Sequence, residues 1–178
     1  LSDLRQGKKI TRRYYDHNLG HFTVPKNVSS NRLIIFEGLH PFYLKRLRQL
    51  FDLKIFIRPD KQLTRHWKII RDCAERGHSK EKILEQLEKR EEDSQRFIEV
   101  QARHADILIE PICKHEIKDL GNDQEKLEYF QRIRINNALY LDPLICELQQ
   151  ISTLQIRHYY EKDDFQFLEV DGEIDKDQ

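Results

Sequence analysis

The sequence is poor in glycine, proline and cysteine and has no long apolar run, and these absences exclude several classes of protein. It contains no methionine, six glycines, five prolines and three cysteines in 178 residues, which excludes collagen-like, low-complexity and disulfide-rich proteins. Its longest apolar runs are of strand length, whereas a membrane-spanning helix needs ~20 apolar residues. Lysine plus arginine and aspartate plus glutamate are balanced at 31 each, so charge gives no reason to expect a nucleic acid or a membrane surface as a partner.

The three cysteines also argue against a metal or disulfide framework. Cys73, Cys113 and Cys146 are far apart and form no C-x-x-C pair, so a reducing, cytoplasm-like compartment is expected. A chain that starts at Leu1 and lacks methionine is expected to be a piece of a longer protein.

The pattern of apolar runs predicts an α/β fold. Continuous runs typical of strands covered on both faces lie at 32–36, 53–57 and 106–109, the last two stopped by Pro59 and Pro111. Helical periodicity is found at 41–51, from Asp60 to about Arg76, and after the capping residue Ser79. This order predicts a mostly parallel sheet with flanking helices, preceded by a loop-dominated segment at 1–31.

The pattern changes after Gly121. Alternation at 127–135 and 165–170, around a short helix near 142–150, predicts an antiparallel extension of the sheet. We therefore expect a single, partial domain over 1–178, with an α/β part at 1–120 and the extension at 121–178.

The strongest chemical signal lies on the helix that Gly77 is expected to close. One arc of this helix is predicted to pack and holds Leu63, Trp67, Ile70 and Ala74; the opposite side holds Lys68, Arg71, Asp72, Glu75 and Arg76. Arginine donates two parallel hydrogen bonds to a phosphate, so the cations indicate an anionic substrate. The alternative is an ordinary amphipathic helix whose two acidic residues neutralise its cations.

Two further segments carry candidate site residues. Glu37 follows a predicted buried strand, at the end where α/β folds bind ligands, and its carboxylate could hold Mg²⁺; the alternative is a turn-stabilising Glu37 with His40 bonded locally. Tyr15 and His17, two residues apart, would point the same way and could bind a sugar hydroxyl; the alternative is plain solvent exposure. We also count His40 as a candidate substrate-binding residue.

A phosphate cradle of the form G-x-x-x-x-G-K-[ST] is absent from the sequence. The only Gly-Lys pair, Gly7-Lys8, has Ser2 in place of the first glycine and Lys9 in place of the Ser/Thr.

These motifs together resemble the phosphoribulokinase and uridine kinase family of P-loop kinases, and within it the phosphoribulokinases of oxygenic phototrophs. The resemblance rests on E-G-L-H-P at 37–41, on K-I-I-R-D-C-A-E-R-G-H-S at 68–79, on H-A-D-I-L-I-E at 104–110 and on E-V-D-G at 169–172. The segment Y-D-H-N-L-G at 15–20 departs from the family form at Asp16 and Leu19, which leaves the sugar open.

The resemblance implies a kinase that uses ATP and Mg²⁺ to phosphorylate a sugar phosphate, giving ribulose 1,5-bisphosphate in the phosphoribulokinase case. It implies that Lys68, Arg71 and Arg76 hold the substrate phosphate and the transferring group, that Glu37 assists Mg²⁺, and that Tyr15 and His17 line the sugar site. The family's P-loop and catalytic base are expected upstream of Leu1, so this chain alone is expected to be inactive.

Two other functions are compatible with these motifs. The first is that of a uridine kinase or another small-alcohol kinase of the same superfamily. The second is that of a P-loop-less binding or regulatory module. The resemblance further implies a homodimer through sheet edges, and a location in the cytoplasm or plastid stroma.

Overall fold

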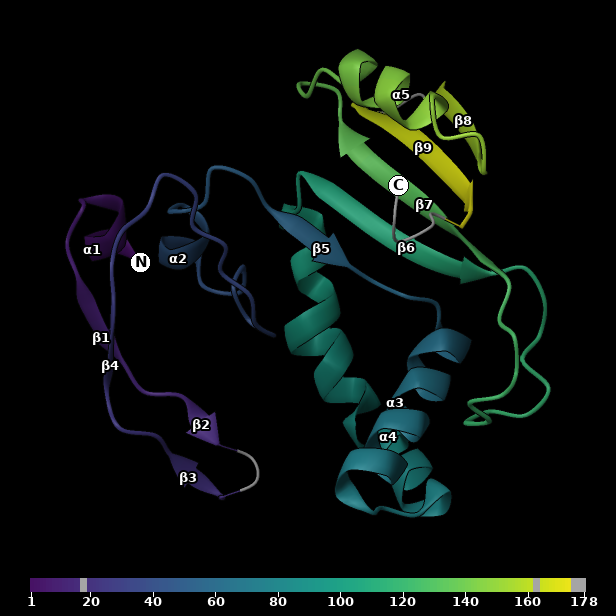
Figure 1. The fold of residues 1–178 in the computed structure, drawn as a ribbon, viewed down its shortest axis with the longest axis horizontal. Coiled ribbons are helices and arrows are strands. Elements are labelled where there is room, and N and C mark those ends of the chain that lie inside the picture. The colour runs from purple at the N-terminus through teal and green to yellow at the C-terminus, as the bar shows by residue number, and fades with distance from the viewer. Residues whose placement is uncertain (17–18, 162–163, 174–178) are drawn as a thin grey trace. The chain divides into compact units, whose positions relative to one another are not determined.

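The computed structural model describes residues 1–16, 19–161 and 164–173. The chain divides into two compact units, 1–52 and 53–178, and Figure 1 labels their α-helices and strands. His17 lies outside the described residues. The expected division near residue 120 stays a prediction.

The first unit consists of short elements joined by long irregular stretches. They are α1 (Ser2–Arg5), β1 (Ile10–Arg12), β2 (Tyr15–Asp16), β3 (His21–Phe22), β4 (Lys26–Val28) and α2 (Lys45–Arg48). β1 pairs antiparallel with β4, and β2 pairs antiparallel with β3. The sequence predicted a loop-dominated segment at 1–31 and did not reveal these two short antiparallel pairs.

Two predictions for the first unit were wrong. Residues 32–36 form no strand, and Leu33 and Ile35 are 75% and 84% exposed. An apolar run becomes a strand only where a neighbouring strand takes its backbone hydrogen bonds, and no described strand pairs with this run. The helix expected over 41–51 shortens to α2. The carbonyls of Phe42 and Tyr43, which a longer helix would use, accept hydrogen bonds from the Arg48 guanidinium.

The second unit is built on a mixed sheet. Its strands are β5 (Ile55–Ile57), β6 (Ile107–Cys113), β7 (Tyr129–Asn136), β8 (Leu154–Tyr160) and β9 (Phe165–Gly172). The order is β5-β6-β7-β9-β8, with β5 and β6 parallel and the other pairs antiparallel. The α/β class and the antiparallel extension are confirmed, although β8 was not foreseen and parallel pairing in this sheet is confined to β5 and β6.

Pro111 does not end its strand as predicted. It lies inside β6, opposite Gln131 of β7, and its carbonyl accepts a hydrogen bond from the backbone N–H of Asp60. Proline is tolerated where the missing N–H would face away from a paired strand, and β5 has already ended at Ile57 at this level. The strand therefore continues to Cys113.

Helices flank both faces of this sheet. They are α3 (Lys61–Arg76), α4 (Lys80–Asp93), the π-helical turn η1 (Ser94–Ile98), the 3-10 helix η2 (Glu99–His104) and α5 (Asp142–Gln149). Leu141, at the start of α5, packs with Ile135 and Leu168 in the buried core of one face. Leu108 and Arg134 point to the other face because side chains alternate along a strand, and there Arg134 donates to the carbonyl of Ala102 in η2.

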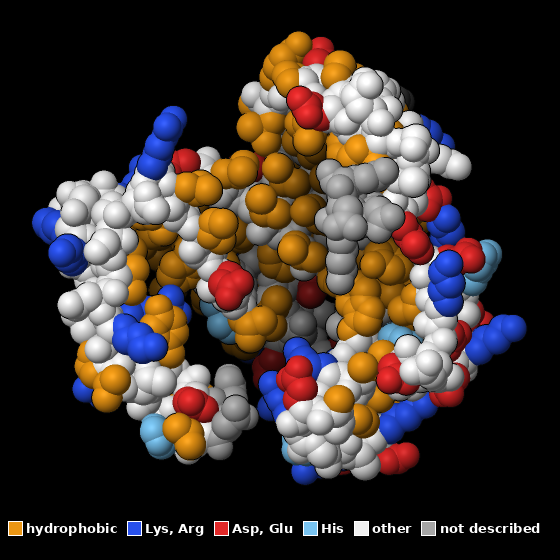
Figure 2. Space-filling view, viewed as in Figure 1, with side chains coloured by type: hydrophobic (Ala, Val, Ile, Leu, Met, Phe, Trp, Pro, Cys, Tyr) orange, Lys and Arg blue, Asp and Glu red, His pale blue; other side chains and the backbone are white. Residues whose placement is uncertain are grey.

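β5 is an edge strand of the sheet, and all three of its residues are apolar. Ile55 and Ile57 are exposed, and Figure 2 shows apolar side chains gathered over the sheet of this unit. None of the helices in the described part of the chain has the length and apolar content that a membrane crossing requires.

Candidate functional site

The helix that carries the predicted cations begins and ends where the sequence indicates. Asp60 is the N-cap of α3, and its Oδ1 accepts a hydrogen bond from the N–H of Leu63 at 2.9 Å. Gly77 follows the last turn in the left-handed conformation, with φ 63°, which glycine adopts without strain. Ser79 then caps α4 as predicted.

The buried side of α3 differs from the predicted arc. The buried residues are Leu63, His66, Ile69 and Asp72, whereas Trp67 and Ala74 are exposed. Trp67 lies edge-to-face against the ring of Tyr129, with centroids 6.0 Å apart. The prediction from hydrophobic residues was wrong because two of the four buried residues, His66 and Asp72, are polar. Each is buried with specific hydrogen-bond partners.

Asp72 gathers the three predicted cations around one carboxylate. Its Oδ2 lies 2.7 Å from Lys68 Nζ, and its Oδ1 accepts from Arg71 Nε at 2.9 Å. An Arg76 guanidinium nitrogen lies 3.3 Å from the same Oδ1. The Asp72 side chain is 1% exposed, while those of Arg71 and Arg76 are 50% and 44% exposed.

The charges of this cluster do not cancel. Burial opposes ionisation of Asp72, but the hydrogen bonds from Lys68 and Arg71 outweigh it and lower the pKa of this carboxyl below its usual value. Among these four side chains, one carboxylate against three cations leaves an excess of two positive charges. The exposed Glu75 of the same helix offsets one of them in part, from solvent, and the side stays positive. Each guanidinium has five N–H donors, so both arginines can bind an anion while they stay attached to Asp72.

The other candidate residues belong to the first unit and are described within it. Tyr15 donates its hydroxyl hydrogen bond to the carbonyl of Gly20 at 3.1 Å, and its ring meets that of Phe22 edge-on. His40 lies edge-on to Tyr43. Glu37 is exposed in an irregular stretch. The structure thus brings Lys68, Arg71 and Arg76 together and describes the remaining candidates separately.

The described residues provide few ligands for a metal ion. They contain no group of three or more histidine, cysteine, aspartate or glutamate side chains that could hold one. Mg²⁺ is commonly bound by one or two carboxylates, with water and substrate phosphates completing the shell. Glu37 is a single exposed carboxylate that does not follow a strand, so its role in holding Mg²⁺ stays a prediction. The sequence contains no phosphate cradle for ATP.

Sequence reasoning missed two buried polar residues of α3. Asp72 was placed on the solvent side, although its spacing of four from both Lys68 and Arg76 is the spacing of helical ion pairs. His66 was not considered at all, and it accepts a hydrogen bond from Gly121 of a distant loop. No local pattern indicates a contact between residues so far apart in the sequence.

Comparison with known proteins shows which family the chain belongs to. The sequence model of the Phosphoribulokinase / Uridine kinase family matches residues 1–118, which include all of α3. The chain is 30% identical to a phosphoribulokinase of Synechocystis sp. over 98% of its own length and 57% of that protein. The chain belongs to this family.

Two further relatives show how far the family likeness extends. Uridine-cytidine kinase B of Dictyostelium discoideum is 35% identical over 61% of the chain and 46% of its own length. The solved structure of the phosphoribulokinase from Rhodobacter spheroides matches the fold with a TM-score of 0.69 and 21% identity, over 94% of this chain and 63% of that one. The chain spans about half the length of the curated relatives it matches.

Proposed function

We propose that the natural protein carrying this chain is an ATP-dependent sugar kinase that transfers the γ-phosphate of ATP to a hydroxyl of ribulose 5-phosphate. The observation that carries the proposal is the α3 cluster, in which an ionised, buried Asp72 holds Lys68, Arg71 and Arg76 with two positive charges in excess. Phosphoryl transfer depends mainly on positioning and on neutralising the charge of the phosphoryl oxygens. A fixed set of cations with half-exposed guanidinium groups is suited to that task.

Each cation has a distinct role in this proposal. Arg71 and Arg76 bind the phosphate of the sugar through their exposed N–H groups, because a guanidinium forms paired hydrogen bonds with phosphate oxygens. Lys68, a compact charge with a mostly buried stem, stabilises the phosphoryl group in transit. Asp72 keeps all three in place and does not itself meet the substrate.

The remaining roles fall to the first unit. Tyr15, His17 and His40 line the sugar site. Glu37 helps to hold Mg²⁺, which when bound neutralises charge on the phosphates of ATP. Because the sequence has no G-x-x-x-x-G-K-[ST] cradle, we propose that this chain alone does not turn over ATP and that the phosphate cradle and catalytic base belong to other parts of a longer protein. We expect that protein in the cytoplasm or plastid stroma, as a homodimer.

The identity of the compound that accepts the γ-phosphate is tested by a coupled ADP-release assay on the full natural protein with ATP and Mg²⁺. Ribulose 5-phosphate, uridine and a control without acceptor are compared. Turnover that depends on ribulose 5-phosphate is the expected result, and turnover that depends on uridine would refute the proposed acceptor.

A uridine-type kinase is the second candidate, since a uridine-cytidine kinase is 35% identical over part of the chain. The match to the Synechocystis protein extends over 98% of the chain, against 61% for that kinase, which favours the sugar phosphate. A folded full protein that is silent with every acceptor would favour a non-catalytic binding or regulatory module.

A further inference from the structure

The last residue of β6 and the chain that follows it are attached to α3 and its N-cap by three hydrogen bonds of one kind. In each, a side chain at the start of α3 accepts from a backbone N–H of the segment 113–125, here named the strap. Asp60 Oδ2 accepts from Cys113 at 2.7 Å, Gln62 Oε1 from Ile117 at 2.9 Å and His66 Nδ1 from Gly121 at 3.2 Å. The donors are four residues apart, so the strap is held along its length.

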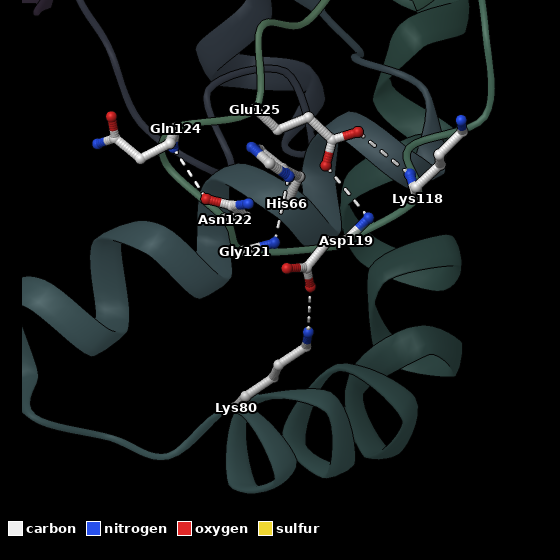
Figure 3. A network of polar contacts seen from close by, with 8 residues as sticks. All are labelled: His66, Lys80, Lys118, Asp119, Gly121, Asn122, Gln124 and Glu125. Carbon is white, nitrogen blue, oxygen red and sulfur yellow. Dashed lines mark hydrogen bonds and ion pairs between the residues drawn. The ribbon is translucent and has the colours of Figure 1, made fainter.

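The strap is also held together internally and tied to α4. Figure 3 shows the Glu125 carboxylate accepting hydrogen bonds from the backbone N–H groups of Lys118 and Asp119, at 3.2 and 3.1 Å. Asp119 in turn forms an ion pair with Lys80 of α4, at 3.2 Å. These contacts give the strap a defined shape next to the helix.

Gly121 is the point of closest approach. Its φ of +91° lies in the region that favours glycine, and a Cβ added there would lie 2.3 Å from Cγ2 of Ile69. Ile69 is buried, so it has little freedom to move aside. The strap backbone therefore fits directly against one turn of α3.

His66 and Ile69, the two residues of α3 next to Gly121, lie on the same side of the helix as Asp72, which holds the cations. His66 and Ile69 precede Asp72 at intervals of three along the buried side of α3. Residues spaced in this way lie on one face of a helix. A change in how α3 is rotated against the strap would therefore change where the Asp72 carboxylate and its three cations point.

We propose that His66 is a positioning residue, which fixes the rotation of α3 through Gly121 of the strap and so aims the cation cluster at the sugar phosphate; this inference rests on the proposed function. Its chemistry is specific, because Nδ1 must carry a lone pair to accept from the Gly121 N–H. A leucine of similar size fills the space without accepting. An asparagine keeps an acceptor oxygen close to the position of Nδ1.

The test compares His66→Leu with His66→Asn in the full natural protein, by steady-state kinetics with ribulose 5-phosphate and ATP. His66→Leu is expected to lower kcat/KM for ribulose 5-phosphate by roughly 10- to 100-fold, the cost of a small misplacement of binding groups, with the KM for ATP unchanged. His66→Asn is expected to keep most of the wild-type kcat/KM for ribulose 5-phosphate. Lys118→Ala is the matched control within the strap, because Lys118 contacts Glu125 through its backbone N–H.

Amide hydrogen exchange gives a readout that does not depend on activity. The Gly121 amide is expected to exchange faster in His66→Leu than in His66→Asn, with α5 and β9 unchanged. Wild-type kinetics in a folded His66→Leu variant would overturn the positioning role and leave the proposed function intact. Faster Gly121 exchange in His66→Leu, together with a wild-type protein that phosphorylates no acceptor, would instead refute the proposed function, and with it the role of His66 in catalysis, while leaving the strap contact established.

Discussion

Asp72 is the residue on which the candidate site depends. It is buried, ionised and bonded to Lys68, Arg71 and Arg76, and a buried carboxylate is tolerated only when its charge is paired in this way. The same contacts restrict three long side chains that would otherwise sample many rotamers. Much of the entropic cost of ordering the cations is therefore met during folding, before a substrate binds.

The lowered pKa of Asp72 predicts a pH-dependent contribution to stability. A carboxyl with a lower pKa in the folded state stabilises the fold above its unfolded pKa of about 3.9, and this contribution is lost as pH falls through the folded value. Asp72→Asn should reduce the free energy of unfolding by about 1–3 kcal/mol at pH 7. Urea denaturation from pH 7 to pH 3 should show the difference from wild type shrinking below about pH 4.

Asp93→Asn is the control for this experiment, since Asp93 is an exposed aspartate on α4. A difference between wild type and Asp72→Asn that stays constant down to pH 3 would contradict the ion pairs described here.

Cys113 is predicted to be far less reactive than the other two cysteines. Burial and the nearby Asp60 carboxylate raise the pKa of the Cys113 thiol to about 11, so only about a thousandth of it is thiolate at pH 8. Cys73 and Cys146 are exposed. Alkylation with iodoacetamide at pH 8, followed by peptide mass mapping, should label Cys73 and Cys146 first. Equal labelling of Cys113 in the folded protein would show that its surroundings are wrongly assigned.

At the scale of elements, α3 was predicted well in its limits and poorly in its orientation. Asp60 and Gly77 are local signals that act within one turn of the chain, so the sequence was sufficient to place both ends. The buried stripe depends on the strap and the sheet, which are distant in sequence. The pattern of hydrophobic residues could therefore not reveal that His66 and Asp72 face inward.

The cap of α3 should contribute more to stability than the cap of α4. Asp60 accepts both from Leu63 N–H and from Cys113 N–H, whereas Ser79 accepts from Lys82 N–H at a longer distance of 3.4 Å. Asp60→Ala is expected to lower the free energy of unfolding by about 2 kcal/mol, and Ser79→Ala by about 0.5 kcal/mol. Denaturant titrations measure both, and equal losses would argue against the second contact of Asp60.

At the scale of the whole molecule, the sequence predicted the fold class and the antiparallel extension because strand alternation and element order are encoded locally. The strand expected at 32–36 failed for the opposite reason, since a strand needs a partner and the described residues offer none to this run. Family membership and the α3 cluster both support the kinase activity proposed for the full protein.

The most direct test of the central claim is the kcat/KM for ribulose 5-phosphate of Arg71→Ala and Arg76→Ala in the full natural protein. Arg65→Ala, an exposed arginine of the same helix outside the Asp72 cluster, is the matched control. We predict a loss of about 100-fold or more in each of the first two variants, and activity within a few-fold of wild type for Arg65→Ala. Wild-type kcat/KM in folded Arg71→Ala and Arg76→Ala would contradict the assignment of this cluster as the phosphate-binding site.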